Sequence, residues 1–170
     1  TVMNYEDEFP DSPSIPSGLP DRKMAVKLAQ QVVKQSNQTA LPIKLSEIVK
    51  TLNTERRKII VKGESLSSGF SGQIVQIGEV TGIMYNSNHN QHRQRFTVAH
   101  ELGHCLMNHS IGMTYKELIN LKNKLKIEKE ANIFAAELLM PKALITKCLK
   151  NKKQTIGELA NLFDVSEEAM

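Results

Sequence analysis

The chain has 170 residues, of which 40 % are hydrophobic and 24 % are charged. These values predict one globular domain with a single core, and they exclude a largely disordered chain. No apolar run approaches the length that crosses a bilayer, and the acidic N-terminus is unlike a signal peptide, so we expect a cytoplasmic protein without a membrane partner. Two cysteines, Cys105 and Cys148, cannot form a disulfide framework, and we expect both thiols to be free.

The net charge of +4 conceals an uneven distribution of charged residues. Residues 1–21 carry five acidic side chains and no basic one, whereas residues 116–153 carry ten lysines and four glutamates. A basic surface of this kind favours an acidic or nucleic-acid-bound partner. Because clustered arginines and interleaved aromatic residues are missing, we expect a solvated helical face and no direct binding of nucleic acid.

The hydrophobic pattern changes its period twice along the chain. Four prolines among acidic and small residues predict an extended arm over residues 1–20. The elements that follow are predicted as helices over 21–37 and 46–52, strands over 58–63, 73–78 and 81–86, and helices over 91–108, 115–139, 141–150 and 155–163. The short connection between the last two strands predicts an antiparallel hairpin.

Residues 100–104 read HELGH and carry the pattern HExxH. Helical residues four positions apart share one face, so the imidazoles of His100 and His104 can bind one metal ion. Zinc bound in this way lowers the pKa of a bound water towards about 7, and Glu101 is placed to accept its proton. The flanking apolar residues predict a core helix, where such polar groups are costly unless they are paired or bound to metal.

A catalytic zinc site needs a third protein ligand, which the segment EKEANIFAAELLMP (128–141) can supply. Glu128 and Asn132 share one helix face, whereas Glu130 lies about 200° from Glu128 and points elsewhere. We predict Glu128 as the third ligand and Asn132 as a group that orients a ligand by a hydrogen bond. Glu130 and Glu137 remain alternatives for the third ligand. Mn²⁺ or Fe²⁺ can occupy a site of this composition, although it suits Zn²⁺.

Together, RQRFTVAHELGH (93–104) and EKEANIFAAELLMP (128–141) resemble the ImmA/IrrE family of bacterial and phage zinc metallopeptidases. The resemblance extends over about residues 43–141, and the tail LANLFDVSEEAM resembles the C-terminal segment of the family. It implies an α+β fold, a small zincin-like domain in which a short, mostly antiparallel sheet packs on the HExxH helix and further helices. Three parts are then expected: an acidic arm (1–20), a zinc metallopeptidase domain (21–150), and a C-terminal helical segment (151–170) that is cut short.

The resemblance also implies the roles of individual residues. Zinc would be held by His100, His104 and, by position, Glu128, a gluzincin-like ligand set, with Glu101 as the general base. The oxyanion formed during peptide hydrolysis needs a further donor. Tyr85, His109 and Arg93 are the candidates for that donor. An edge strand, either 73–78 or 81–86, is expected to align an extended substrate.

Known members of the family cut helix-turn-helix repressors of mobile elements or stress responses. The resemblance therefore predicts a zinc-dependent endopeptidase that cleaves a specific protein, a DNA-binding transcriptional repressor of this kind. The alternative is a non-proteolytic anti-repressor that binds the same partner and displaces it. A nucleic-acid-binding module that uses the lysines of residues 116–153 is a third hypothesis, and it predicts strongly salt-dependent binding to DNA.

Overall fold

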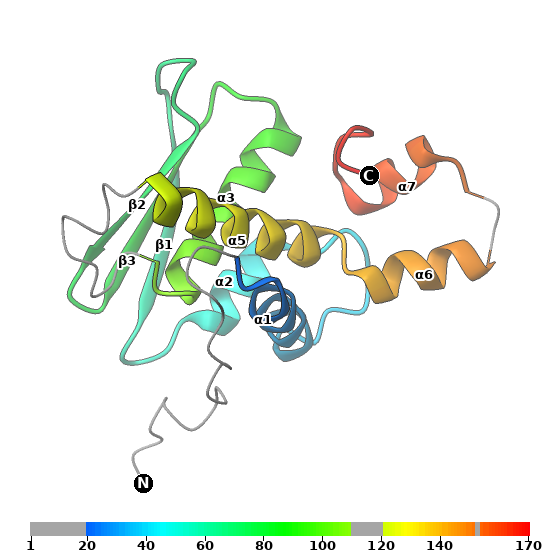
Figure 1. Cartoon of the computed structure of the whole chain (residues 1–170), viewed down its shortest axis with the longest axis horizontal. Coiled ribbons are helices and arrows are strands. Elements are labelled where there is room, and N and C mark those ends of the chain that lie inside the picture. The colour runs from blue at the N-terminus through cyan, green and yellow to red at the C-terminus, as the bar shows by residue number, and fades with distance from the viewer. Residues whose placement is uncertain (1–19, 110–120, 152–153) are drawn as a thin grey trace, which may run out of the picture.

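A computed structural model of the chain describes residues 20–109, 121–151 and 154–170 (Figure 1). The elements are α1 (Arg22–Gln35), α2 (Leu45–Leu52), β1 (Lys58–Glu64), β2 (Gly72–Ile77), β3 (Val80–Asn86), α3 (Gln91–Leu106), α5 (Leu121–Leu139), α6 (Lys142–Asn151) and α7 (Ile156–Phe163). The predicted α+β fold class is confirmed. The predicted ends of the elements agree within two residues, except that the expected helix start at residue 115 lies outside the described residues.

The sheet has three strands in the order β1-β3-β2. β2 and β3 form the predicted antiparallel hairpin, and Gly78, with a φ of +58°, opens its two-residue turn. A positive φ at this position matches the twist of a hairpin and favours glycine. β1 pairs with β3 in parallel, so the sheet is mixed. The prediction was a mostly antiparallel sheet, but only one of the two pairs of strands is antiparallel. The central place goes to β3, whose inward residues Thr81 and Ile83 are buried, while β2 is largely exposed.

Caps at both ends fix the helix that carries HExxH. At the start of α3, the Asn90 side chain accepts a hydrogen bond from the Arg93 N–H at 2.9 Å. At its end, Asn108 adopts a left-handed conformation with a φ of +54°. The His109 N–H then donates to the His104 carbonyl at 3.1 Å, which is the hydrogen bond across five residues that defines a Schellman motif. This turn brings His109 back against the last turn of the helix.

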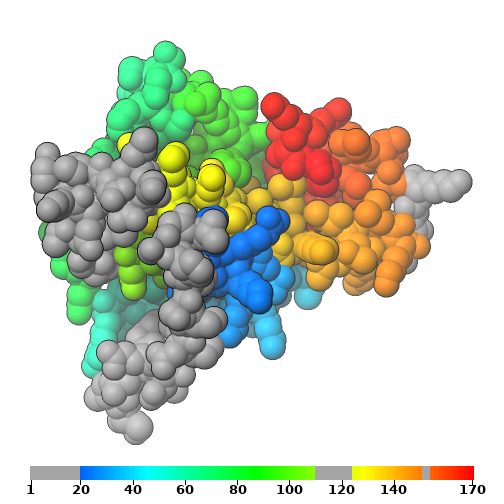
Figure 2. Space-filling model, viewed as in Figure 1, coloured from blue at the N-terminus to red at the C-terminus, as the bar shows by residue number. Residues whose placement is uncertain are grey.

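The layers of the molecule follow one another as sheet, α3, α5 and α1. Figure 2 shows the surface of α1, in blue, against that of α5, in yellow. At the crossing of α3 and α5, Gly103 lies against Ala131 and Phe134, and a Cβ on Gly103 would lie 3.2 Å from the Ala131 Cα. Ala131 and Ala135 are fully buried, so the small residues of α5 let the two helices approach closely.

The C-terminal helix packs into the same core. Leu159, Phe163 and Val165 are buried in the hydrophobic cluster that contains the residues of α3 and α5. The Arg95 guanidinium of α3 pairs with Asp164 at 3.1 Å, which ties the end of α7 to the zinc-motif helix. The domain boundaries predicted at residues 20 and 150 stay predictions.

Two further expectations concern the whole chain. Cys105 and Cys148 are free, as predicted. Within the ranges that the structure describes, no helix combines the length and the apolar character needed to cross a membrane.

Candidate metal centre

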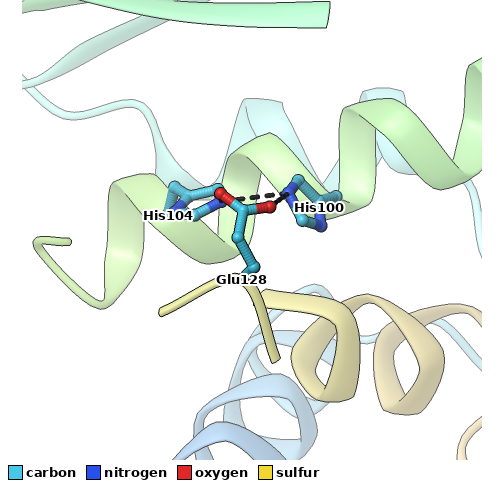
Figure 3. Close-up of side chains that lie close together, drawn as sticks. All are labelled: His100, His104 and Glu128. Carbon is cyan, nitrogen blue, oxygen red and sulfur yellow. Dashed lines mark hydrogen bonds and ion pairs between the residues drawn. The ribbon is translucent and has the colours of Figure 1, made fainter. Parts of the chain in front are cut away.

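Two elements bring the predicted ligands together. His100 and His104 lie one turn apart on α3 and face α5, from which Glu128 points back at them (Figure 3). The two Nε2 atoms are 3.0 Å apart, and the Glu128 carboxylate oxygens lie 3.3 Å from His100 Nε2 and 3.6 Å from His104 Nε2. Three potential ligand atoms from two helices therefore converge on one point.

These atoms fit a divalent transition metal in number, type and spacing. The three ligand atoms all lie within 4.8 Å of one another. Zinc bonds of about 2.0–2.1 Å in a tetrahedral arrangement separate neighbouring ligand atoms by about 3.3 Å, close to the observed spacings. Two imidazoles and one carboxylate leave a coordination position open, as in catalytic zinc sites. The residues present can thus hold zinc with little rearrangement.

The side of each imidazole that faces away from this point has a hydrogen-bond partner. His100 Nδ1 lies 2.8 Å from Asn132 Oδ1, which is the contact predicted for Asn132. His104 Nδ1 lies 2.9 Å from His109 Nδ1. Such contacts fix the orientation of a metal-binding imidazole. Burial, followed by the neighbouring His100 and His109 rings, lowers the pKa of His104 to about 3, so this ring is neutral at pH 7.

Glu101 lies on the side of α3 that faces β2. It is 9 % exposed, and its carboxylate approaches the backbone of Gly72, where an added Cβ would lie 3.4 Å from Oε1. Burial, with a further contribution from the charge of Glu128, raises the pKa of Glu101 to about 7. A carboxylate in such surroundings is a better base than one in water, because its ionised form is less stabilised by solvent.

A cleft of about 900 Å³ opens over these groups. Its helical wall includes His100, Glu101, His104 and Glu128, and its strand wall is formed by residues 69–74. The candidate metal ligands and the candidate base therefore lie in one cleft that a substrate can enter.

The three candidates for the oxyanion donor lie in different places. Arg93 lines the cleft, and its guanidinium donates to Ser71 Oγ at 3.0 Å. His109 is 5 % exposed and lies behind His104, on the side away from the cleft. Tyr85 packs over Gly63 and lines a separate cavity on the other side of α3. Only Arg93 of the three is in position to meet a substrate.

The alternatives for the third ligand have other partners. Glu130 points away from Glu128, as predicted, and its Oε2 lies 3.0 Å from His109 Nε2. Burial alone would raise the pKa of Glu130, but hydrogen bonds from His109 and from the Asp21 N–H, together with the charges of nearby basic side chains, lower the pKa overall. The pairing of Glu130 with His109 escaped the sequence analysis, because its geometry depends on the turn at Asn108.

Parts of this chain are similar in sequence or structure to known proteins. Residues 54–170 match the sequence model of a peptidase family described as IrrE N-terminal-like domain. A curated relative, "Uncharacterized immunity region protein 2" of Bacillus phage phi105, is 36 % identical over 95 residues, covering 50 % of this chain and 60 % of that protein. The chain thus spans less than two thirds of the relative's length. A solved structure of a "Mycobacterium tuberculosis transcriptional regulator" has a TM-score of 0.61 at 14 % identity, covering 86 % of this chain and 44 % of that one, which shows a shared fold.

Proposed function

Because the family match covers more than half of the chain, the protein belongs to the IrrE N-terminal-like domain family, and we propose that it is a zinc-dependent endopeptidase. One observation carries this proposal: His100, His104 and Glu128 converge beside Glu101 in a single open cleft. The family is a peptidase family, and the cluster has the composition of a catalytic zinc site.

In this proposal His100, His104 and Glu128 hold the zinc ion, which when bound polarises the scissile carbonyl and acidifies water. The Glu101 carboxylate accepts the proton of the attacking water and delivers it to the leaving amine. The Arg93 guanidinium, which lines the same cleft, is the candidate that stabilises the oxyanion. Asn132 keeps the His100 ring in place by its hydrogen bond.

The substrate is proposed to bind as an added strand along β2. The hypothesis that residues 81–86 serve this purpose is wrong, because β3 is paired on both sides. β2 is an edge strand that enters the cleft, so the hypothesis for residues 73–78 stands. The Asn86 N–H donates to the Ser71 carbonyl at 2.8 Å, and alternation along an antiparallel ladder then turns the backbone groups of Gly72, Ile74 and Gln76 outward. Within the described ranges these groups have no strand partner, and they can pair with a substrate backbone of any sequence.

The proposed substrate is a helix-turn-helix transcriptional repressor. Support comes from the relative in Bacillus phage phi105, whose name places it in an immunity region, and from the resemblance to a family whose known members cut such repressors. Such a substrate is cytoplasmic, and the proposed site of action is therefore the cytoplasm. Zinc as the native metal rests on the donor set, which Mn²⁺ or Fe²⁺ can share.

The test uses the purified full chain loaded with zinc and the DNA-binding repressor encoded nearest to its own gene. Mass spectrometry of the mixture should find one cleavage site with the wild type and none with the Glu101→Gln variant. Intact repressor after incubation with zinc-loaded wild type, when a control peptidase cuts the same repressor in a parallel reaction, would contradict cleavage of that substrate. If Glu101→Gln still released the uncut repressor from its operator DNA, displacement without proteolysis would replace the proposed function.

A further inference from the structure

We infer that His109 and Glu130 are positioning residues that hold His104 in the one tautomer able to bind a metal ion. The inference deepens the proposed function and rests on it in one respect, the binding of a metal by His104. Neither residue lines the cleft around the ligand cluster, so neither is placed to touch the substrate. Both act through the far side of the His104 ring.

The side chains of His104, His109 and Glu130 form a buried hydrogen-bonded series that leads away from the metal site. His104 Nδ1 lies 2.9 Å from His109 Nδ1, and His109 Nε2 lies 3.0 Å from Glu130 Oε2. The His109 and Glu130 side chains are 5 % and 6 % exposed. Polar groups this deeply buried are costly without partners, so their mutual hydrogen bonds are expected to be well formed.

The Glu130 carboxylate, at the end of this series of hydrogen-bonded side chains, determines which nitrogen of each of the two imidazoles carries the proton. Because an ionised carboxylate only accepts hydrogen bonds, His109 must carry its proton on Nε2, opposite Glu130. In a neutral His109 ring, Nδ1 is then an acceptor, and His104 Nδ1 must donate to it. A neutral His104 protonated on Nδ1 has its lone pair on Nε2, and Nε2 is the atom that faces His100 and Glu128.

Backbone contacts hold both ends of this hydrogen-bonded series in place. The left-handed Asn108 turns the chain so that the His109 N–H donates to the His104 carbonyl, which sets one imidazole beside the other. The second oxygen of Glu130 accepts the Asp21 backbone N–H at 2.6 Å. Asp21 is also the N-cap of α1, so the carboxylate is fixed by an element that is remote from the metal in sequence.

The other histidine is supported differently. His100 has one partner on its outer side, the amide oxygen of Asn132 at 2.8 Å, which belongs to the helix that supplies Glu128. A carboxylate behind an imidazole raises its basicity more than a neutral amide does. Behind His104 the carboxylate of Glu130 acts through His109, whereas behind His100 the only such partner among the described residues is the Asn132 amide.

The first test compares zinc affinity in Glu130→Gln and Glu137→Gln, two amide variants on α5, by competition with a chromogenic chelator. A glutamine at position 130 must turn its NH₂ group either to the Asp21 N–H or to His109 Nε2, so one contact is lost or the tautomers reverse. We expect Glu130→Gln to weaken zinc binding about 10- to 100-fold, as loss of such outer partners does. Glu137, whose Oε1 accepts from Gln30, should tolerate the change. Wild-type affinity in a folded Glu130→Gln variant would overturn the inference.

The second test separates the hydrogen bond from mere packing. His109→Asn keeps an acceptor oxygen at the place of Nδ1, whereas His109→Leu keeps the bulk and removes the acceptor. We expect His109→Asn to retain more zinc affinity than His109→Leu. Equal losses in the two variants would assign His109 a packing role and overturn the inference.

The third test needs no substitution. In ¹⁵N-histidine spectra of the zinc-loaded wild type, His109 should be neutral, protonated on Nε2 and coupled through a hydrogen bond to His104 Nδ1. A proton on His109 Nδ1 would overturn the inference. The inference and the proposed function can fail separately. A wild type that binds zinc but cuts no repressor would contradict the proposed function and leave the inference about His104 intact. Absence of zinc binding by the wild type would overturn both.

Discussion

The two walls of the cleft are built in different ways. The helical wall fixes its polar groups with side-chain hydrogen bonds, at 2.8 Å between His100 and Asn132 and at 2.9 Å between His104 and His109. The strand wall, residues 69–74, is partly exposed: Phe70 keeps 47 % of its surface in solvent. Among the described residues, no strand lies beside the outward backbone groups of β2.

The difference separates two tasks. A metal site loses affinity when its ligands move by fractions of an ångström, so its two histidines are largely buried and bonded to a second layer of residues. A substrate of varied sequence is best held by backbone pairing, so its wall offers an unpaired strand edge. The account predicts that substitutions in the helical wall abolish chemistry or metal binding, and that those in the strand wall reduce substrate binding.

The largest effect is expected at Glu101, which belongs to the helical wall and faces the strand wall. Glu101→Gln keeps the shape of the side chain and removes the base. We expect cleavage of a protein substrate to fall about 10²- to 10⁴-fold, the usual contribution of a general base. Zinc content should stay at the wild-type level, and retained cleavage with bound zinc would remove Glu101 from the proposed mechanism.

Gly72 is the point where the two walls meet. A Cβ there would lie 2.4 Å from Thr97 Cγ2 and 2.8 Å from the Met84 carbonyl, so β2 must shift in Gly72→Ala. Thr97 cannot turn aside freely, because its hydroxyl donates to the Arg93 carbonyl. We expect the free energy of unfolding to fall by about 1–3 kcal/mol, with a loss of activity.

The control for this substitution is Gly69→Ala, in the connection that leads into β2. No described residue comes within 4 Å of a Cβ at Gly69, so stability should hardly change. Chemical denaturation of the two variants measures both values. Equal stabilities would mean that β2 does not lie against α3 as closely as described.

The strand edge is tested by Ile74→Pro and Gln76→Pro. Both remove an outward N–H, but only Ile74 lines the cleft. Loss of one backbone hydrogen bond to the substrate, worth about 1 kcal/mol, should reduce kcat/KM about fivefold in Ile74→Pro. Gln76→Pro should retain wild-type kcat/KM, and equal reductions in both variants would argue against strand addition at the cleft.

A smaller effect is expected where the helices cross. A Cβ on Gly103 would lie 3.0 Å from Phe134 Cδ1 and 3.2 Å from the Ala131 Cα, so Gly103→Ala must push α5 away by a few tenths of an ångström. Glu128 moves with α5, and zinc affinity should fall severalfold while the helix content is kept. An unchanged affinity would mean that the crossing does not set the distance from Glu128 to the histidines.

The sequence predicts those parts of the site that depend on positions within one helix. His100 and His104, four residues apart, and Glu128 and Asn132, also four apart, share faces by the helical period alone. That the two faces meet depends on the crossing of α3 and α5, which the small residues of α5 indicate. The contact of His109 with Glu130 could not be predicted, because it requires the left-handed turn at Asn108 and the docking of Asp21.

The strand order was also beyond sequence analysis. The hairpin of β2 and β3 is local and its turn is visible in the residues, with Gly78 at the required position. The parallel place of β1 beside β3 depends on which strand the helices bury, and this is decided by packing across the whole core. The same packing left β2 at the edge and so decided which strand can meet a substrate.

The most direct test of the account is the zinc content of the chain after mild chelation and re-addition of Zn²⁺, in the wild type, Glu128→Ala and Glu137→Ala. The account predicts one zinc per chain in the wild type and in Glu137→Ala, and clear loss of affinity in Glu128→Ala. One zinc in all three would contradict the assignment of Glu128 as the third ligand, and no zinc in the wild type would contradict the metal centre itself.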